Sequence, residues 1–241
     1  MESFLNQVPA FFSAGNVTLL AKAVGVTIAL TFFGCLVGFT SAFLIVMARQ
    51  TPGRWAIPLR GAAILFVELF RRVPFLVTSY LVLFSIVIVI KNPSLFIVGL
   101  VSIAIYATAF TSDIIRGGFE SIPRQQIEAA QTLNFGRWRT MLYVVIPQSW
   151  PVILPPLIIF MVAFVKDTSL VGYIGVFELA FRGKELNNQG FSGIFVYGFI
   201  ALIYFCLSFP LMRFGYWLEK RLATSRGQKS QRELRQPAGP A

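Results

Sequence analysis

Long apolar runs, separated by shorter polar and basic stretches, dominate the pattern of residues along this chain. Five apolar segments extend over about residues 17–47, 74–90, 94–115, 148–171 and 192–218. A helix needs roughly 20 predominantly apolar residues to cross the hydrocarbon core of a bilayer. The pattern therefore predicts an all-α integral membrane protein with five transmembrane helices, in a transmembrane domain that covers residues 1–222.

A further apolar stretch, Gly61–Phe70, precedes the second segment and is too short to cross a membrane. It would cover only about 15 Å as a helix, half of a bilayer core. Arg71, Arg72 and Pro74 then interrupt the run. We therefore expect an interfacial helix that leads into the second span. Glu68 lies three and four residues before the two arginines, a spacing that predicts a surface ion pair in the headgroup region.

Lysine and arginine residues are distributed unevenly between the two sides that these spans create. Positive charge is retained on the cytoplasmic side of a membrane protein. With the N-terminus outside and the C-terminus inside, most of the 21 basic residues fall in cytoplasmic segments. They are Arg49, Arg54, Arg60, Arg71, Arg72, Arg116, Arg124, Arg137, Arg139, Arg213, Lys220, Arg221, Arg226, Lys229, Arg232 and Arg235. We expect this orientation, and we expect the basic stretch 223–241, which ends in Pro and Gly, to form a disordered cytoplasmic tail.

The composition narrows the class of function. Of the 241 residues, 56% are hydrophobic and 13% are charged, and the mean hydropathy is +0.72, which is typical of a membrane protein. The net charge of +11 is explained by topology and contact with anionic lipid, so we expect no nucleic-acid partner. Histidine is absent and no G-x-x-x-x-G-K-[ST] motif occurs, so we expect no catalytic residue and leave any phosphate chemistry to a partner. Cys35 and Cys206 lie in apolar runs and fit neither a metal site nor a disulfide framework.

The polar connection at about residues 116–147 falls on the cytoplasmic side in this topology. Glu128, Ala129 and Ala130 begin a short helical run, and Asn134 follows it as a residue that tolerates the left-handed conformation at a helix end. Alanines on an exposed helix leave a smooth surface, and Glu128 could pair with a basic or hydrogen-bonding group of a partner. On physical grounds a docking element and a plain solvated connection both remain open.

Several ordered motifs resemble those of permease subunits of the polar amino acid family of ABC importers. The E-A-A pattern is carried by Glu128, Ala129 and Ala130, with Asn134 in the place of the family's glycine, and Pro147 follows at the next span. The segments VELFRRVPFL, SDIIRGGFESIPRQQIEAA and VKDTSL are similar to further family motifs, with departures at Arg72, Val73, Asp113 and Gln125. The resemblance covers about residues 17–220.

The resemblance implies a five-helix permease bundle of the type I importer architecture in the cytoplasmic (inner) membrane of a prokaryote. It implies a second permease, identical or paralogous, and an extracytoplasmic substrate-binding protein that delivers a polar amino acid. It also implies a cytoplasmic ATP-binding subunit that uses ATP and Mg, so that this chain holds no cofactor and is not itself an enzyme. Carried over to this chain, Glu128, Ala129 and Ala130 would contact that subunit and Asn134 would end the helix.

An ionisable residue inside a span is a candidate for the substrate path because it is costly there. Lys166 and Asp167 form such a pair near the outer half of the fourth span, followed by the hydroxyls of Thr168 and Ser169. Asp167 is our candidate for binding the ammonium group of an amino acid. Lys166 and Asp167 could instead neutralise each other or cap the helix end. Asp113 precedes Arg116 at a helical spacing that favours a structural pair.

The segment at residues 169–190, between the last two spans, mixes glycines with a short apolar run. It fits an external re-entrant helix that meets a delivering protein, and an ordinary amphipathic surface helix fits equally well. A secondary transporter or channel that works without ATP is the alternative function, although neither an inverted repeat nor a series of intramembrane acids is evident. A membrane scaffold would leave the ordered motifs unexplained.

Overall fold

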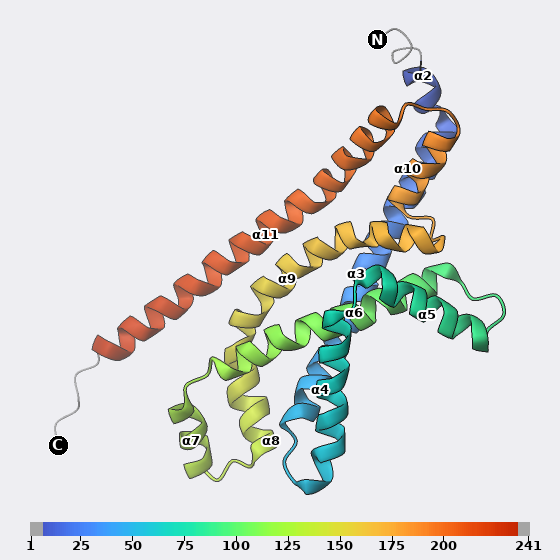
Figure 1. Ribbon diagram of the computed structural model, residues 1–241. Helices are drawn as coiled ribbons and strands as arrows, with labels where there is room; N and C mark the ends of the chain where they lie inside the picture. The colour runs from blue at the N-terminus through green and yellow to red at the C-terminus, as the bar shows by residue number, and fades with distance from the viewer. Residues whose placement is uncertain (1–6, 236–241) are drawn as a thin grey trace. The chain divides into compact units, whose positions relative to one another are not determined.

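The computed structural model describes residues 7–235, with side chains described as far as Leu222, and this part of the chain is helical without strands (Figure 1). The helices are α2 (Val8–Phe11), α3 (Ala14–Gln50), η1 (Arg54–Ala56), α4 (Ile57–Arg72), α5 (Phe75–Val89), α6 (Leu95–Glu120), α7 (Arg124–Thr132), α8 (Arg137–Thr140), η2 (Met141–Val145), α9 (Ile146–Val171), η3 (Gly172–Ile174), α10 (Leu179–Asn188) and α11 (Gly193–Arg235). The predicted all-α membrane fold is confirmed.

Four helical stretches are long and apolar enough to cross a membrane: Ala14–Gln50, Leu95–Glu120, Arg137–Ile174 and Gly193–Leu222. The bent pair Arg54–Arg72 and Phe75–Val89 gives a fifth if it is one span. The stretch Arg137–Ile174 begins about ten residues before the predicted fourth span, which was expected to start at about residue 148. The helix that contains Gly193–Leu222 runs on as helical backbone to Arg235, past the expected start of the tail. Disorder of that tail stays a prediction, because its side chains and residues 236–241 lie outside the described part.

The bend of 118° between α4 and α5 has a local cause in the sequence. Pro74 occupies the N-cap position of α5, and a proline disfavours the helical conformation of the residue before it. Val73 is accordingly extended, with φ −89° and ψ 132°, so α4 ends at Arg72. Four residues earlier, Glu68 accepts two hydrogen bonds from Arg72 at 2.7 and 3.1 Å, which confirms the predicted ion pair on this helix face.

The chain packs in two units, of which the first comprises the residues up to Asp113 together with Phe160–Phe209. Its core contains Leu30, Cys35, Ile103 and Phe164, all fully or almost fully buried. Two glycines allow α3 to lie directly against α6: a Cβ atom on Gly38 would lie 2.4 Å from that of Ala107, and one on Gly34 would lie 2.6 Å from Ile103. Small residues permit this close approach of helices in lipid.

The second unit comprises Ile114–Ile159 and the chain from Pro210 onward. Here α6 and α9 also meet at a glycine, because a Cβ atom on Gly118 would lie 2.2 Å from Ile153 Cγ1. The π-helical turn η2 lies directly before the start of α9. Pro147 has no N–H group and its ring clashes with the carbonyl four residues earlier, which lies within η2. The wider turn lets the helix continue through the proline.

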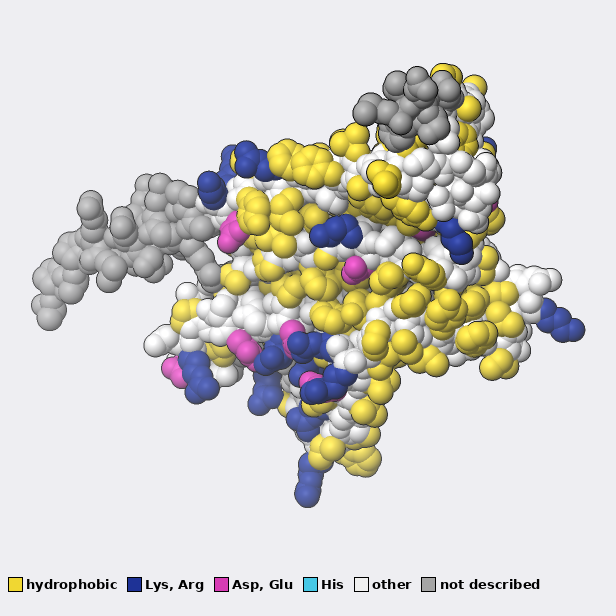
Figure 2. Space-filling model, turned by 45° about the horizontal axis from the view of Figure 1, so that its top comes forward, with side chains coloured by type: hydrophobic (Ala, Val, Ile, Leu, Met, Phe, Trp, Pro, Cys, Tyr) yellow, Lys and Arg dark blue, Asp and Glu magenta, His cyan; other side chains and the backbone are white. Residues whose placement is uncertain are grey.

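Large apolar side chains remain exposed over much of the protein, and Figure 2 shows hydrophobic groups covering wide areas between scattered charges. Examples on the predicted spans are Phe32, Phe33, Leu81, Phe84, Leu202, Phe205 and Phe209. A soluble monomer rarely exposes apolar surface on this scale. These side chains are suited to contact with lipid or with other membrane-spanning subunits.

Candidate functional site

The polar connection at residues 116–147 contains the short helix α7, which presents the three candidate docking residues differently. Glu128 and Ala129 are exposed, whereas Ala130 is only 5% exposed and packs into the second unit. A nine-residue helix is too short to be stable alone in water, so packing by its buried face is required. The arrangement therefore leaves one acidic and one small side chain free for contact, while Ala130 fixes the helix to its own unit.

The end of α7 is defined by Asn134, the only non-glycine residue of the described chain with a positive φ, at 61°. The N–H of Phe135 donates to the carbonyl of Ala130 at 3.0 Å, and the N–H of Asn134 donates to that of Gln131 at 2.9 Å. These two bonds form a Schellman motif, which satisfies carbonyls that the helix end would otherwise leave open. The helix ends at the place that the sequence predicted, with Asn in the left-handed conformation.

Exposed apolar side chains accompany α7 in the two elements that pack against it, α8 and η2. Trp138, Leu142 and Tyr143 are each more than half exposed, and so is Leu133 just after α7. The rings of Phe135 and Tyr143 lie edge to face at 6.5 Å between centroids. Aromatic side chains such as Trp and Tyr are enriched at protein interfaces. The sequence analysis did not identify these side chains as part of a possible interface.

The four candidate pathway residues lie on the last turns of α9. Lys166 is exposed, Asp167 and Ser169 are half-buried, and Thr168 is fully buried. The Thr168 hydroxyl donates to the carbonyl of Val165 at 2.7 Å, so this hydroxyl is already satisfied within its own helix. Lys166 and Asp167 form no ion pair in the described structure. Lys166, Asp167 and Ser169 are therefore the three side chains of this segment with both access and hydrogen-bonding capacity.

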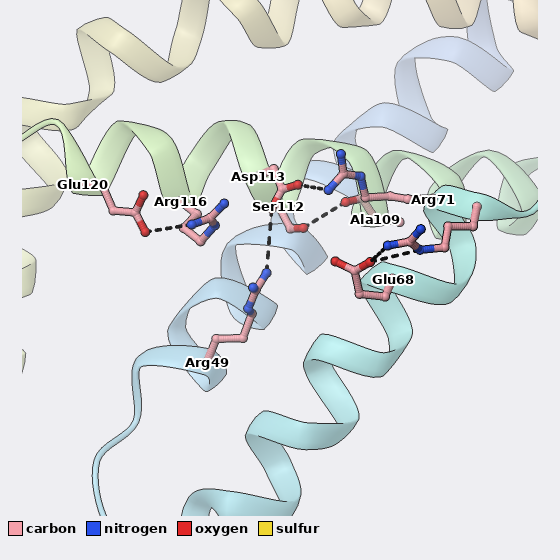
Figure 3. A network of polar contacts seen from close by, with 9 residues as sticks. Arg49, Glu68, Arg71, Ala109, Ser112, Asp113, Arg116 and Glu120 are labelled. Carbon is pink, nitrogen blue, oxygen red and sulfur yellow. Dashed lines mark hydrogen bonds and ion pairs between the residues drawn. The ribbon is translucent and has the colours of Figure 1, made fainter.

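Ion pairs between charged side chains connect three helices of the first unit (Figure 3). Asp113 on α6 forms ion pairs with Arg71 at the end of α4 and, at 3.8 Å, with Arg49 at the end of α3. The guanidinium of Arg71 also lies 5.9 Å from the ring centroid of Phe110. In the second unit, Arg116 pairs with Glu120 at 2.9 Å. Asp113 thus contacts partners far away in sequence, which the helical spacing to Arg116 did not reveal.

Glu178, which the sequence analysis missed, is fully buried between α9 and α10. Its carboxylate accepts hydrogen bonds from the N–H groups of Ala180 at 2.8 Å and Phe181 at 2.7 Å, and from the hydroxyl of Tyr204 at 2.8 Å. Burial raises the pKa of this carboxyl group above its usual range, and the hydrogen bonds act against that shift. An acid flanked by Phe177 and Leu179 was the signal in the sequence.

Comparison with known proteins gives a family and several relatives. The model of the family described as "Binding-protein-dependent transport system inner membrane component" matches residues 36–224. The chain is 31% identical to the probable glutamine ABC transporter permease protein GlnM of Bacillus subtilis (strain 168), over 70% of this chain and 78% of that protein. It is 29% identical to the L-cystine transport system permease protein TcyB of the same organism, over 91% and 97%. It is 28% identical, over 88% of its own length, to the inner membrane amino-acid ABC transporter permease protein YhdY of Escherichia coli (strain K12) and spans 56% of that protein.

Solved structures agree with this assignment at the level of the fold. The crystal structure of an amino acid ABC transporter with histidines is similar with a TM-score of 0.79 and 26% identity, over 90% of this chain and 98% of that one. An inward-facing structure of the MetNI methionine ABC transporter is similar with a TM-score of 0.72 and 21% identity, over 88% and 99%. The 21% identity to the MetNI structure supports a common fold only.

Proposed function

The chain belongs to the family of binding-protein-dependent transport system inner membrane components, with relatives that are amino-acid ABC transporter permeases, and from this premise we propose that it is the membrane-spanning subunit of an ATP-driven importer of a polar amino acid. The observation that carries the proposal is the geometry of α7. This short helix exposes Glu128 and Ala129, is held to its own unit by Ala130 and is closed by Asn134. A partner can bind the exposed face of this helix while its buried face stays packed against its own unit.

Coupling to an ATPase requires an element that moves as a rigid body between two arrangements. The buried face of α7 and the Schellman motif at its end limit motion of the helix relative to its unit. We propose that a cytoplasmic ATP-binding subunit holds Glu128 and Ala129 in a cleft, with Trp138 and Tyr143 as neighbouring contacts. ATP and Mg are then used by that subunit, and this chain supplies only the mechanical connection.

The transported amino acid would pass near the outer end of α9, where Asp167 is half-buried and Ser169 is accessible. A carboxylate can bind the ammonium group of an amino acid, and a hydroxyl can bind either of its charged ends. Five helices are few to surround such a path, so we propose a dimer with an identical or paralogous permease. The N-terminus would lie outside, the C-terminus inside, and an extracytoplasmic binding protein would deliver the substrate in a prokaryotic inner membrane.

The test is to tag the chain, solubilise native membranes in a mild detergent and identify the copurifying proteins by mass spectrometry. We expect an ATPase subunit with the wild type and none with Glu128→Arg, because charge reversal would oppose docking. The matched control is Gln126→Arg on the same helix. Gln126 is exposed and lies about 200° around the helix from Glu128.

The control variant should retain the ATPase, which separates a local effect on the docking face from a general effect of added positive charge. Absence of an ATPase from the wild type, under conditions that keep the protein folded and oligomeric, would contradict the proposal and favour a transporter that works without ATP. Retention of the ATPase by Glu128→Arg would contradict only the assignment of Glu128 to the docking face.

A further inference from the structure

Glu178 and the residue after it, Leu179, connect parts of four helices in the first unit. The carboxylate oxygens of Glu178 accept the N–H groups of Ala180 and Phe181 at the start of α10, and the hydroxyl of Tyr204 from α11. The next residue, Leu179, donates its N–H to the hydroxyl of Thr27 on α3 at 3.2 Å. Elements from three distant parts of the chain therefore meet at one fully buried acid.

The fourth connection is steric and reaches α9. Gly172 directly follows α9, and a Cβ atom at this position would lie 2.5 Å from Glu178 Oε1. No side chain can occupy that space, so the carboxylate lies directly against the backbone at the end of α9. The turn between them is held by the N–H of Val176, which donates to the carbonyl of Val171 at 3.3 Å, and by Gly175 in the left-handed conformation.

A buried carboxylate is costly unless it is paired or hydrogen-bonded. No basic side chain forms an ion pair with Glu178 in the described structure, so the carboxylate is stabilised by neutral donors, chiefly the N–H groups of Ala180 and Phe181 and the hydroxyl of Tyr204. These donors belong to two different helices, and they can all be satisfied only while α10 and α11 keep one relative position. The acid therefore acts as a geometric constraint between helices, beyond capping α10.

The turn beside Glu178 carries exposed side chains and lies next to the candidate pathway residues. Tyr173 and Phe177, on either side of the turn, are 67% and 63% exposed. Ser169 precedes Gly172 by less than one helical turn on continuous helical backbone. Resting on the transport function proposed above, we propose that Glu178 is a positioning residue that makes α10 and the pathway segment at residues 166–169 move together. Displacement of α10 would then change the pathway residues directly.

The test compares transport with ATP consumption in the complete complex, reconstituted in proteoliposomes with the ATPase and binding protein that copurify. The probe is a radiolabelled mixture of L-amino acids, and the measured quantity is the amount taken up per ATP hydrolysed. A variant that merely unfolds loses both activities together, so this ratio does not depend on the folded fraction. Loss of positioning lowers the ratio, because ATP hydrolysis continues without productive movement of the pathway.

We expect Glu178→Ala to lower the ratio about five-fold or more, the lower end of typical coupling between sites. Glu178→Gln keeps one acceptor oxygen and should lie between Glu178→Ala and the wild type. Gly172→Ala should act like Glu178→Ala, because its methyl group would displace the carboxylate. The control is Gly198→Ala on α11, where an added Cβ atom would meet nothing within 4 Å and the ratio should not change.

If Glu178→Ala does not fold, the test uses Tyr204→Phe instead. This substitution removes the hydrogen bond from the Tyr204 hydroxyl to Glu178 and keeps the cap of α10 intact. We expect a reduced ratio of uptake to ATP hydrolysed. A wild-type ratio in the folded variants, with both rates lowered in parallel, would overturn the positioning role and leave only a structural one. A wild-type complex that shows no ATP-dependent uptake would instead overturn the proposed function, so the two failures are distinguishable.

Discussion

Two short helices between the predicted spans, α7 and α10, have nearly the same length but use their polar groups in opposite ways. α7 has no side-chain cap at its start, and its one acid, Glu128, is exposed. α10 is capped by the fully buried Glu178, which is bound in turn by Tyr204 of another helix. In α7 hydrogen-bonding capacity is left for a partner, whereas in α10 it is consumed within the chain. Changes in the first should alter association, and changes in the second should alter stability.

The largest effect is expected from bulk on the exposed face of α7. Ala129→Trp should reduce ATP-driven uptake to the level without ATP, because a large side chain would prevent seating of the helix in a cleft. The thermal unfolding temperature should stay at the wild-type value, since the position is exposed. Gln131→Trp is the matched control, because Gln131 is exposed and lies about 200° around the helix from Ala129; it should retain uptake. Wild-type uptake by Ala129→Trp would remove α7 from the coupling path.

The corresponding change at α10 should be measured as lost stability. Glu178→Ala leaves two partly buried N–H groups and the partly buried Tyr204 hydroxyl without their acceptor, and an unsatisfied group costs about 1–3 kcal/mol when it is shielded from water. We expect a loss of about 3 kcal/mol or more in the free energy of unfolding, measured by denaturant titration in detergent. Glu128→Ala on α7 should stay within about 0.5 kcal/mol of the wild type. Equal losses at both positions would contradict the contrast between the helices.

A smaller effect is expected where α7 ends. Asn134 has φ 61°, a conformation that a β-branched side chain adopts only with strain. Asn134→Val should therefore lower the free energy of unfolding by about 1–2 kcal/mol. Asn134→Gly should be neutral or slightly stabilising, because glycine adopts this conformation without a Cβ penalty. Equal stability of the two variants in denaturant titration would show that the left-handed turn does not constrain the helix end.

Structural features that depend on local sequence could be predicted. The spans follow from runs of apolar residues, and the end of α7 follows from Asn134, whose conformational preference needs no distant partner. The start of the helical stretch Arg137–Ile174 at Arg137 was not predicted, because the polar residues before Pro147 fit a loop of residues 116–147. The π-helical turn η2, which lets the helix continue through this proline, has no separate signal in the sequence.

The role of Glu178 could not be predicted in the same way. The hydroxyl that binds its carboxylate lies 26 residues away, and the Thr27 hydroxyl that fixes its neighbour Leu179 lies 152 residues from that leucine. An acid in an apolar segment indicates only that something must satisfy it. Asp113 is a parallel case, since Arg71 and Arg49 approach it from other helices, which the helical spacing to Arg116 did not indicate. Sequence patterns show where polar groups must be satisfied, and the tertiary fold determines the partners.

The smallest expected effect concerns the pH dependence of the buried acid. Glu178 lies outside the predicted spans, and burial raises its pKa in the folded protein above the value in the unfolded chain. The protonated carboxyl is therefore favoured by folding, and its contribution to stability is fully present below the unfolded pKa and is lost as pH rises through the folded pKa. Against Glu178→Gln, which cannot titrate, the relative stability of the wild type should fall as pH rises above the usual range of a glutamate, by at most about 1.4 kcal/mol per pH unit. Parallel unfolding temperatures of the two proteins as pH rises would show that the hydrogen bonds from Ala180, Phe181 and Tyr204 fully offset the cost of burying the charge.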